Sequence, residues 1–96
     1  MPIAILTLEL RMEAAHSLKD KRQVLRSLKD RLRGKFNVAV AELDSNDLWQ
    51  RATVGVVSVS GSKDYLTGLM QNVEREAGRI ANNNGAEITD SFVEYL

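Results

Sequence analysis

The chain has no cysteine, a single histidine and a single proline among its 96 residues. Without cysteine it can form no disulfide, no thiolate metal site and no cysteine nucleophile, so its stability has to come from packing. It also lacks any run of about 18 apolar residues, the length that a membrane-spanning helix needs. The chain passes from Met1 and Pro2 straight into a strand-like segment without a basic leader, and we therefore expect a cytoplasmic protein.

Neither sign of charge is in excess, because 13 Lys and Arg balance 13 Asp and Glu. Zero net charge argues against a protein whose whole surface attracts polyanions. The charges are nevertheless unevenly distributed. The segment from Ser17 to Lys35 has eight basic and two acidic residues, which leaves +6, whereas Lys63 to Leu96 has three basic and six acidic residues, which leaves −3. We therefore expect an electrically polar molecule.

Length and composition are those of one ordinary globular domain. Hydrophobic residues make up 44 % of the chain and charged residues 27 %, which is typical of a folded protein. A chain of this length builds one core. The sequence shows no linker and no low-complexity stretch, so we expect a single domain over residues 1–96.

Four segments have the composition of β-strands. The first alternates apolar and polar residues, the period of a strand with one buried face, the second and third are rich in valine, alanine or threonine, and the last closes the chain after the second helix. These segments are Ile3–Met12, Phe36–Leu43, Arg51–Ser60 and Ala86–Leu96. The polar cluster Asp44–Asp47 predicts a turn that joins the second and third strands into a hairpin. In the last strand we expect Ile88, Phe92 and Val93 in the core.

Two segments have the 3.6-residue apolar period of amphipathic helices. One begins after a capping Ser17 and runs to Gly34, and the other follows a cap at Ser60 or Ser62 and stops at Asn82–Gly85. The order of elements is βαββαβ. Short, right-handed connections resolve this order into an α+β, ferredoxin-like sandwich with two helices on one face of a four-stranded antiparallel sheet.

Three segments together resemble a known family. They are Ser17–Arg22 (SLKDKR), Phe36–Glu42 (FNVAVAE) and Asp47–Ala52 (DLWQRA). Over essentially its whole length the chain resembles the YlxP-like family of small bacterial proteins, a domain of unknown function. The resemblance implies a ferredoxin-like fold. It also points toward RNA or the ribosome, because genes of the family often lie beside those of translation initiation and ribosome maturation factors. It carries over no catalytic residue.

Basic side chains gather on one side of the first predicted helix. At about 100° per residue, five of them share a sector of about 80° beside the apolar stripe, over a length of about 20 Å. Such a row can meet the phosphates of a nucleic acid, and its like charges repel one another by a few tenths of a kcal/mol per pair when no partner is bound. The alternative is a solvated face that pairs with carboxylates elsewhere in the fold. The five residues, which we call the basic ridge, are Lys19, Arg22, Arg26, Lys29 and Arg33.

Four further side chains are candidates for a role. An exposed Trp49 beside Arg51 would stack a base or anchor a protein, but we expect the commoner arrangement, in which the ring folds over the end of the core. Glu42 either turns outward or pairs with Arg51 across the hairpin. His16 has neither a neighbouring nucleophile nor a set of metal ligands, so we expect no catalytic or metal-binding role for it.

Several activities of ferredoxin-like proteins lack the residues that they require. An acylphosphatase needs a glycine-rich, arginine-bearing cradle after the first strand, which Glu13–Ser17 does not offer. A metal chaperone needs a cysteine pair. An RNA-recognition motif needs aromatic residues on its central strands, whereas the third strand contains Val, Thr, Ser and Gly. We therefore expect a module that is not an enzyme and uses no cofactor or metal.

Two hypotheses remain open for such a module. In the first, the basic ridge contacts structured RNA or a ribosomal assembly intermediate, assisted by Arg51 and Trp49. In the second, the chain is a protein-interaction or structural module that forms a homodimer through the open face of its sheet. Thr7, Glu9 and Arg11 indicate that part of that face is wet.

Overall fold

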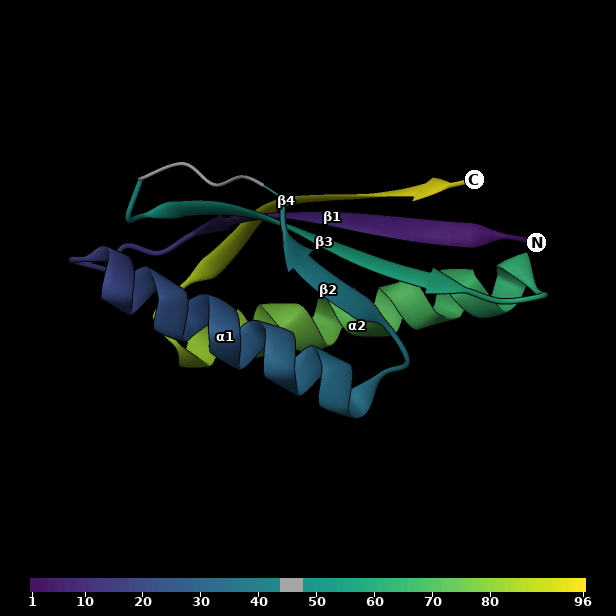
Figure 1. The fold of residues 1–96 in the computed structure, drawn as a ribbon, viewed down its shortest axis with the longest axis horizontal. Coiled ribbons are helices and arrows are strands. Elements are labelled where there is room, and N and C mark those ends of the chain that lie inside the picture. The colour runs from purple at the N-terminus through teal and green to yellow at the C-terminus, as the bar shows by residue number, and fades with distance from the viewer. Residues whose placement is uncertain (44–47) are drawn as a thin grey trace.

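The computed structural model describes residues 1–43 and 48–96 (Figure 1). The elements follow one another as β1 (Ile3–Arg11), α1 (Leu18–Lys35), β2 (Ala39–Glu42), β3 (Arg51–Val59), α2 (Lys63–Asn83) and β4 (Glu87–Tyr95). The predicted order of strands and helices is confirmed. The turn predicted at Asp44–Asp47 lies outside the described residues.

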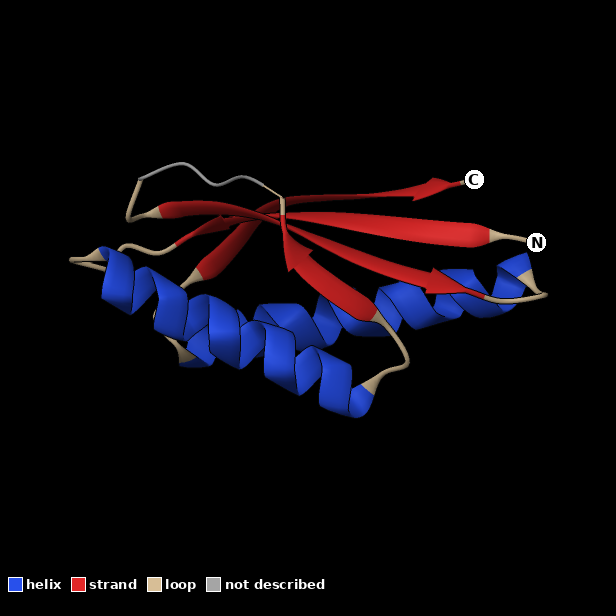
Figure 2. Cartoon of the chain, in the orientation of Figure 1, coloured by secondary structure: helices blue, strands red, loops and turns tan. Residues whose placement is uncertain are grey.

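The strands form one antiparallel sheet in the order β2-β3-β1-β4. Both helices lie on one face of this sheet, and no helix of the described residues covers the other face (Figure 2). The central strands pair along their whole length, from Ile3 opposite Val59 to Arg11 opposite Arg51. β2 is a short edge strand of four residues. The predicted ferredoxin-like sandwich is therefore confirmed.

The core lies between the sheet and the helices. The alternation in β1 is confirmed, because Leu6, Leu8 and Leu10 are all buried against the helices, as is Met12 beyond the strand. The prediction for Phe92 is wrong, since its side chain is 47 % exposed. Val93 lies opposite Leu6 and faces inward, and successive strand residues point to opposite faces, so Phe92 has to point outward.

Local sequence sets the ends of both helices. The Ser17 Oγ accepts a hydrogen bond from the backbone N–H of Asp20 at 3.1 Å, and the Ser62 Oγ accepts one from that of Tyr65 at 3.2 Å. Each hydroxyl satisfies a backbone donor that has no partner within its helix. After α2 the chain turns at Gly85, whose φ of 75° lies in the left-handed region that favours glycine. Within the described residues, neither helix is both long and apolar enough to cross a membrane.

Candidate nucleic-acid interface

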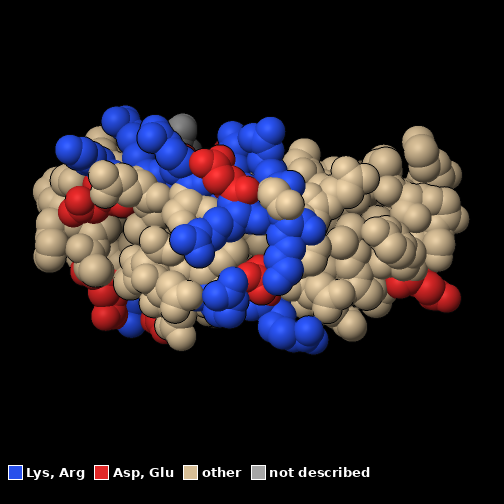
Figure 3. Space-filling view, turned by 90° about the horizontal axis from the view of Figure 1, so that it is seen from below, with Lys and Arg blue, Asp and Glu red and all other residues tan. Residues whose placement is uncertain are grey.

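The basic ridge forms one wall of a groove between α1 and the edge strand β2. All five ridge side chains are exposed, and Lys and Arg dominate the middle of the helix-covered face (Figure 3). The groove has a volume of about 420 Å³. Four ridge residues line it, together with apolar and acidic neighbours. The lining residues are Arg22, Leu25, Arg26, Lys29, Asp30 and Arg33 of α1, Val40, Ala41 and Glu42 of β2, and Val54 of β3.

The ridge cations take no part in the ion pairs of residues 1–43 and 48–96. The basic residues in those pairs are Arg11, Lys21, Lys35 and Arg79. The alternative, in which the ridge cations pair with carboxylates elsewhere in the fold, is therefore not found among these residues. Like charges stand three and four residues apart along α1, an arrangement that lowers helix stability when no anion is bound.

A buried lysine that the sequence reasoning missed joins α1 to the strands. Lys21 is 2 % exposed, and its Nζ donates to the Leu48 carbonyl oxygen at 3.0 Å and lies 3.5 Å from Glu42 Oε2. Of the two alternatives for Glu42, the outward orientation agrees with its exposed side chain, and its ion pair in the described residues is with Lys21 and not with Arg51. Lys21 stands three residues after Leu18 and four before Leu25, on the apolar stripe of the helix. A lysine within the apolar stripe of a helix is the sequence feature that could have predicted this buried cation.

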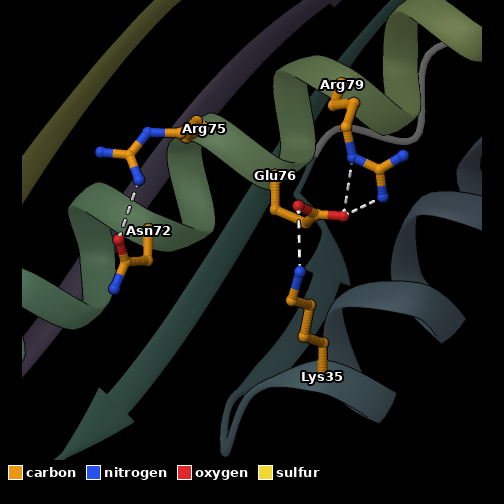
Figure 4. Close-up of polar contacts among 5 residues, drawn as sticks. All are labelled: Lys35, Asn72, Arg75, Glu76 and Arg79. Carbon is orange, nitrogen blue, oxygen red and sulfur yellow. Dashed lines mark hydrogen bonds and ion pairs between the residues drawn. The ribbon is translucent and has the colours of Figure 1, made fainter.

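A carboxylate on α2 holds the carboxyl-terminal end of α1. Glu76 pairs with Lys35 of α1 at 3.2 Å and accepts hydrogen bonds from Arg79 (Figure 4). The hydrogen bond from the Arg79 guanidinium, opposed by desolvation and reinforced by the Lys35 ammonium, lowers the pKa of Glu76 from 4.5 to about 2. This carboxylate on α2 therefore pairs with Lys35 and Arg79 and with none of the ridge cations.

Arg51 and Trp49 lie apart from the groove. They line a shallow hollow of about 460 Å³ with Leu48 and Gln50, and among the described residues none lines both this hollow and the groove. The Trp49 side chain is 50 % exposed, so the expectation that it closes the end of the core is wrong. The neighbouring Gln50 accepts a hydrogen bond at its carbonyl oxygen from the backbone N–H of the buried Met12 at 2.8 Å.

The open face of the sheet has an apolar end and a polar end. At the polar end, the Thr53 hydroxyl donates to the Glu9 carboxylate at 2.9 Å, and Arg11 pairs with Glu13 and Glu87. Toward the other end most cross-strand neighbours on this face are aliphatic or aromatic, and the exposed Glu94, opposite Ile5, is the charged residue among them. The aliphatic and aromatic residues are Ile3, Ile5, Val57, Val59, Phe92 and Leu96, of which the last three are 51 %, 47 % and 72 % exposed.

The described residues contain no group of three or more His, Cys, Asp or Glu side chains placed to hold a metal ion. His16 lies at the start of α1, where its backbone N–H donates to the Asp20 carboxylate at 3.0 Å. That bond helps to fix the approach to the helix.

Comparison with known proteins places the chain among relatives without an assigned activity. A family model described as "Protein of unknown function (DUF503)" matches residues 3–92. The uncharacterized protein YlxP of Bacillus subtilis (strain 168) is 45 % identical over 59 residues. That match covers 62 % of this chain and 64 % of YlxP, less than two thirds of the relative.

Solved structures of low sequence identity share the fold. A C-terminal segment of the alpha subunit of aIF2 from Pyrococcus abyssi has a TM-score of 0.54 at 13 % identity, over 97 % of this chain and 50 % of that one. Arabidopsis thaliana MSL1 has a TM-score of 0.60 at 21 % identity, over 93 % and 34 %. The designed protein LFR1 1, described as having a ferredoxin fold, has a TM-score of 0.54 at 7 % identity, over 100 % and 84 %. These likenesses show the fold alone.

Proposed function

The chain belongs to the DUF503 family of proteins of unknown function, and on that premise we propose that it is a binding module, not an enzyme, that holds structured RNA by its phosphates. One observation carries the proposal. Four cations of the basic ridge line one groove, and no ridge cation is in an ion pair within the described residues. A ribosomal assembly intermediate is one source of such RNA.

The ridge has the dimensions of a phosphate-binding surface. From Arg22 to Arg33 the helix rises about 16 Å, so that four cations can each reach a separate backbone phosphate. Each phosphate contact releases a condensed counterion, and four contacts give a slope of log K against log salt of about −3 to −4. Contacts to phosphates distinguish sequences poorly. We therefore expect tight binding only at low salt, with little preference among RNA sequences.

The composition of the groove supports binding over catalysis. Its lining includes two carboxylates, Asp30 and Glu42, but no serine, threonine, cysteine or histidine among the residues that the structure describes. A hydroxyl or thiol nucleophile with a histidine base, the commonest arrangement for acyl transfer, is thus missing from the described lining.

Filter binding to ribosomal RNA at increasing salt tests the proposal. The variant R22E/R26E/K29E should lose binding by at least tenfold at low salt. Its matched control, R31E/K63E/R75E, changes the net charge equally at exposed positions outside the groove and should bind within about threefold of the wild type. Absence of binding at low salt, or equal losses in the two variants, would refute the proposal.

The open face of the sheet supports a second candidate function, self-association. The whole face measures roughly 30 Å by 20 Å, so two copies in contact bury about 1,200 Å² in total, the lower end of the range for specific interfaces. The exposed Val59, Phe92 and Leu96 at its apolar end favour such a contact. We expect a weak homodimer whose population depends on concentration.

Sedimentation velocity over a range of concentrations tests this second candidate. Phe92→Arg should abolish the dimer, because it replaces an exposed aromatic ring on the open face with a charged side chain. Tyr65→Arg, at an exposed aromatic position on α2, is the control and should leave the dimer intact. A wild-type protein that is strictly monomeric at high micromolar concentration would exclude self-association.

A further inference from the structure

The floor of the groove differs in chemistry from its rim. Beneath the ridge cations, the groove is lined by Val40 and Val54, which are 7 % and 3 % exposed, and by the partly buried Leu25. Phosphates gain nothing from aliphatic surface, and the carboxylates of Asp30 and Glu42 repel an anion that enters the groove. We therefore expect phosphates to bind at the rim of the groove and a flat, uncharged group to bind in its interior.

The edge of β2 supplies hydrogen-bonding groups at the same place. The Leu43 N–H donates to the Thr53 carbonyl oxygen at 2.8 Å, so these two residues form a hydrogen-bonded pair of the ladder. Such pairs alternate along antiparallel strands, and the N–H and C=O groups of Val40 and Glu42 accordingly point away from β3. β2 is the edge strand, so no further strand takes these groups in the described sheet.

Together these features match the parts of a nucleotide. A volume of about 420 Å³ falls within the range of about 300 to 1,000 Å³ that small-molecule sites occupy. The aliphatic floor contacts the face of a base, and arginine guanidinium groups stack on such faces. The β2 backbone and the Glu42 carboxylate can pair with the donors and acceptors of its edge, as carboxylates do with the amino group of cytosine.

We propose that the groove takes an unpaired nucleotide, so that the RNA partner is single-stranded where it meets α1 and β2. This inference rests on the proposed function and narrows it to loops, bulges and ends. A base stacked within a duplex cannot enter the groove, and duplex RNA reaches only the rim cations through its phosphates. An acidic peptide that adds a strand to β2 is the competing occupant.

The experiment compares a 12-nucleotide RNA of mixed, unstructured sequence with the blunt duplex of the same sequence, by fluorescence anisotropy at one salt concentration. We expect the single strand to bind at least tenfold tighter than the duplex. Equal affinity for both RNAs overturns the groove assignment and leaves the phosphate-binding proposal standing. Absence of binding to either RNA overturns both. Tighter binding of an oligoglutamate peptide than of the single strand also overturns the assignment.

A variant that fills the groove without changing the charge provides a second measurement. Leu25→Trp should weaken binding of the single strand by at least tenfold and leave duplex binding within about twofold. Leu69→Trp on α2, which is partly buried against the core as Leu25 is, serves as the control and should change neither. If Leu25→Trp unfolds, a 2-aminopurine base in the single strand decides, because its emission should change on binding the wild type. Unchanged emission on binding overturns the proposal.

Discussion

The two helices cover the same sheet but contribute to it differently. α2 buries six residues, all of them apolar, and packs against the central strand β1 and against β4. α1 is nearly as long, yet it buries only Leu28, Leu32 and the charged Lys21, and it packs against the edge strand β2 and against α2. Stability is therefore concentrated in α2. A helix that adds little to the core can carry uncompensated like charges, and this is where the groove lies.

Truncation of a fully buried leucine in α2 and of a partly buried leucine in α1 should give the largest difference. Leu66→Ala in α2 should cost about 3 kcal/mol of unfolding free energy, because it leaves a cavity at a fully buried site. Leu25→Ala in α1 should cost about 1 kcal/mol, since that side chain is only partly buried. Urea denaturation measures both. Equal losses would remove the contrast between the helices.

Lys21 is the residue of α1 that we expect to contribute most to stability after the core leucines. Its replacement should have the next largest effect on the unfolding free energy. Lys21→Ala leaves the Leu48 carbonyl oxygen without this donor and Glu42 without its cation, which we expect to cost about 2 kcal/mol. Lys21→Met keeps the apolar stem and should cost about half as much. Thermal unfolding checks the ranking. If both variants are as stable as the wild type, Lys21 does not hold α1 to the strands.

Trp49 follows Leu48, whose carbonyl oxygen binds Lys21. We expect Trp49 to contribute less to the free energy of unfolding than the size of its side chain suggests. Because the ring is half exposed, Trp49→Ala should cost less than about 1 kcal/mol, against the 3 kcal/mol or more that removal of a core tryptophan costs. In the wild type we expect red-shifted emission and free access of iodide to the ring. A blue-shifted, protected tryptophan would place it in the core after all.

Removal of one ridge charge should slightly stabilise the protein. Arg22 stands three residues from Lys19 and four from Arg26, with no carboxylate at either spacing, so Arg22→Gln relieves repulsion worth about 0.3 kcal/mol. The same change should weaken RNA binding. Denaturation and binding measured on one preparation would show the two effects moving in opposite directions. Loss of stability in this variant would indicate that the ridge supports the fold.

Glu76 connects the helices, and we expect its stabilising effect at neutral pH to be lost in acid. Its pKa in the folded protein is about 2, below the ordinary 4.5, so it stabilises the fold above pH 4.5 and loses that contribution as the pH falls toward 2. Glu76→Gln should lower the thermal midpoint slightly at pH 7, and the difference from the wild type should shrink below pH 4.5. A difference that is constant with pH would contradict this role.

The parts of the structure that sequence predicts are those that local chemistry decides. Strand alternation buries Leu6 and Leu8, and the hydroxyls of Ser17 and Ser62 begin the helices as expected. Helical periodicity also places the basic ridge on one side of α1. The orientation of Phe92 depends on strand register, and the burial of Lys21 depends on a carbonyl oxygen 27 residues away. Contacts between residues so far apart in the sequence cannot be predicted from the spacing of apolar residues within one segment.

The open edge of β2 also bears on aggregation. Unpaired N–H and C=O groups at the edge of a sheet recruit strands from other chains, and this is how many proteins begin to form fibres. Here the edge is only four residues long and lies beside the ridge cations. Two copies that approach edge to edge bring these cations together, and their repulsion opposes the pairing. The charge that attracts a polyanion thus also keeps the protein from assembling through this strand, and high salt weakens both effects.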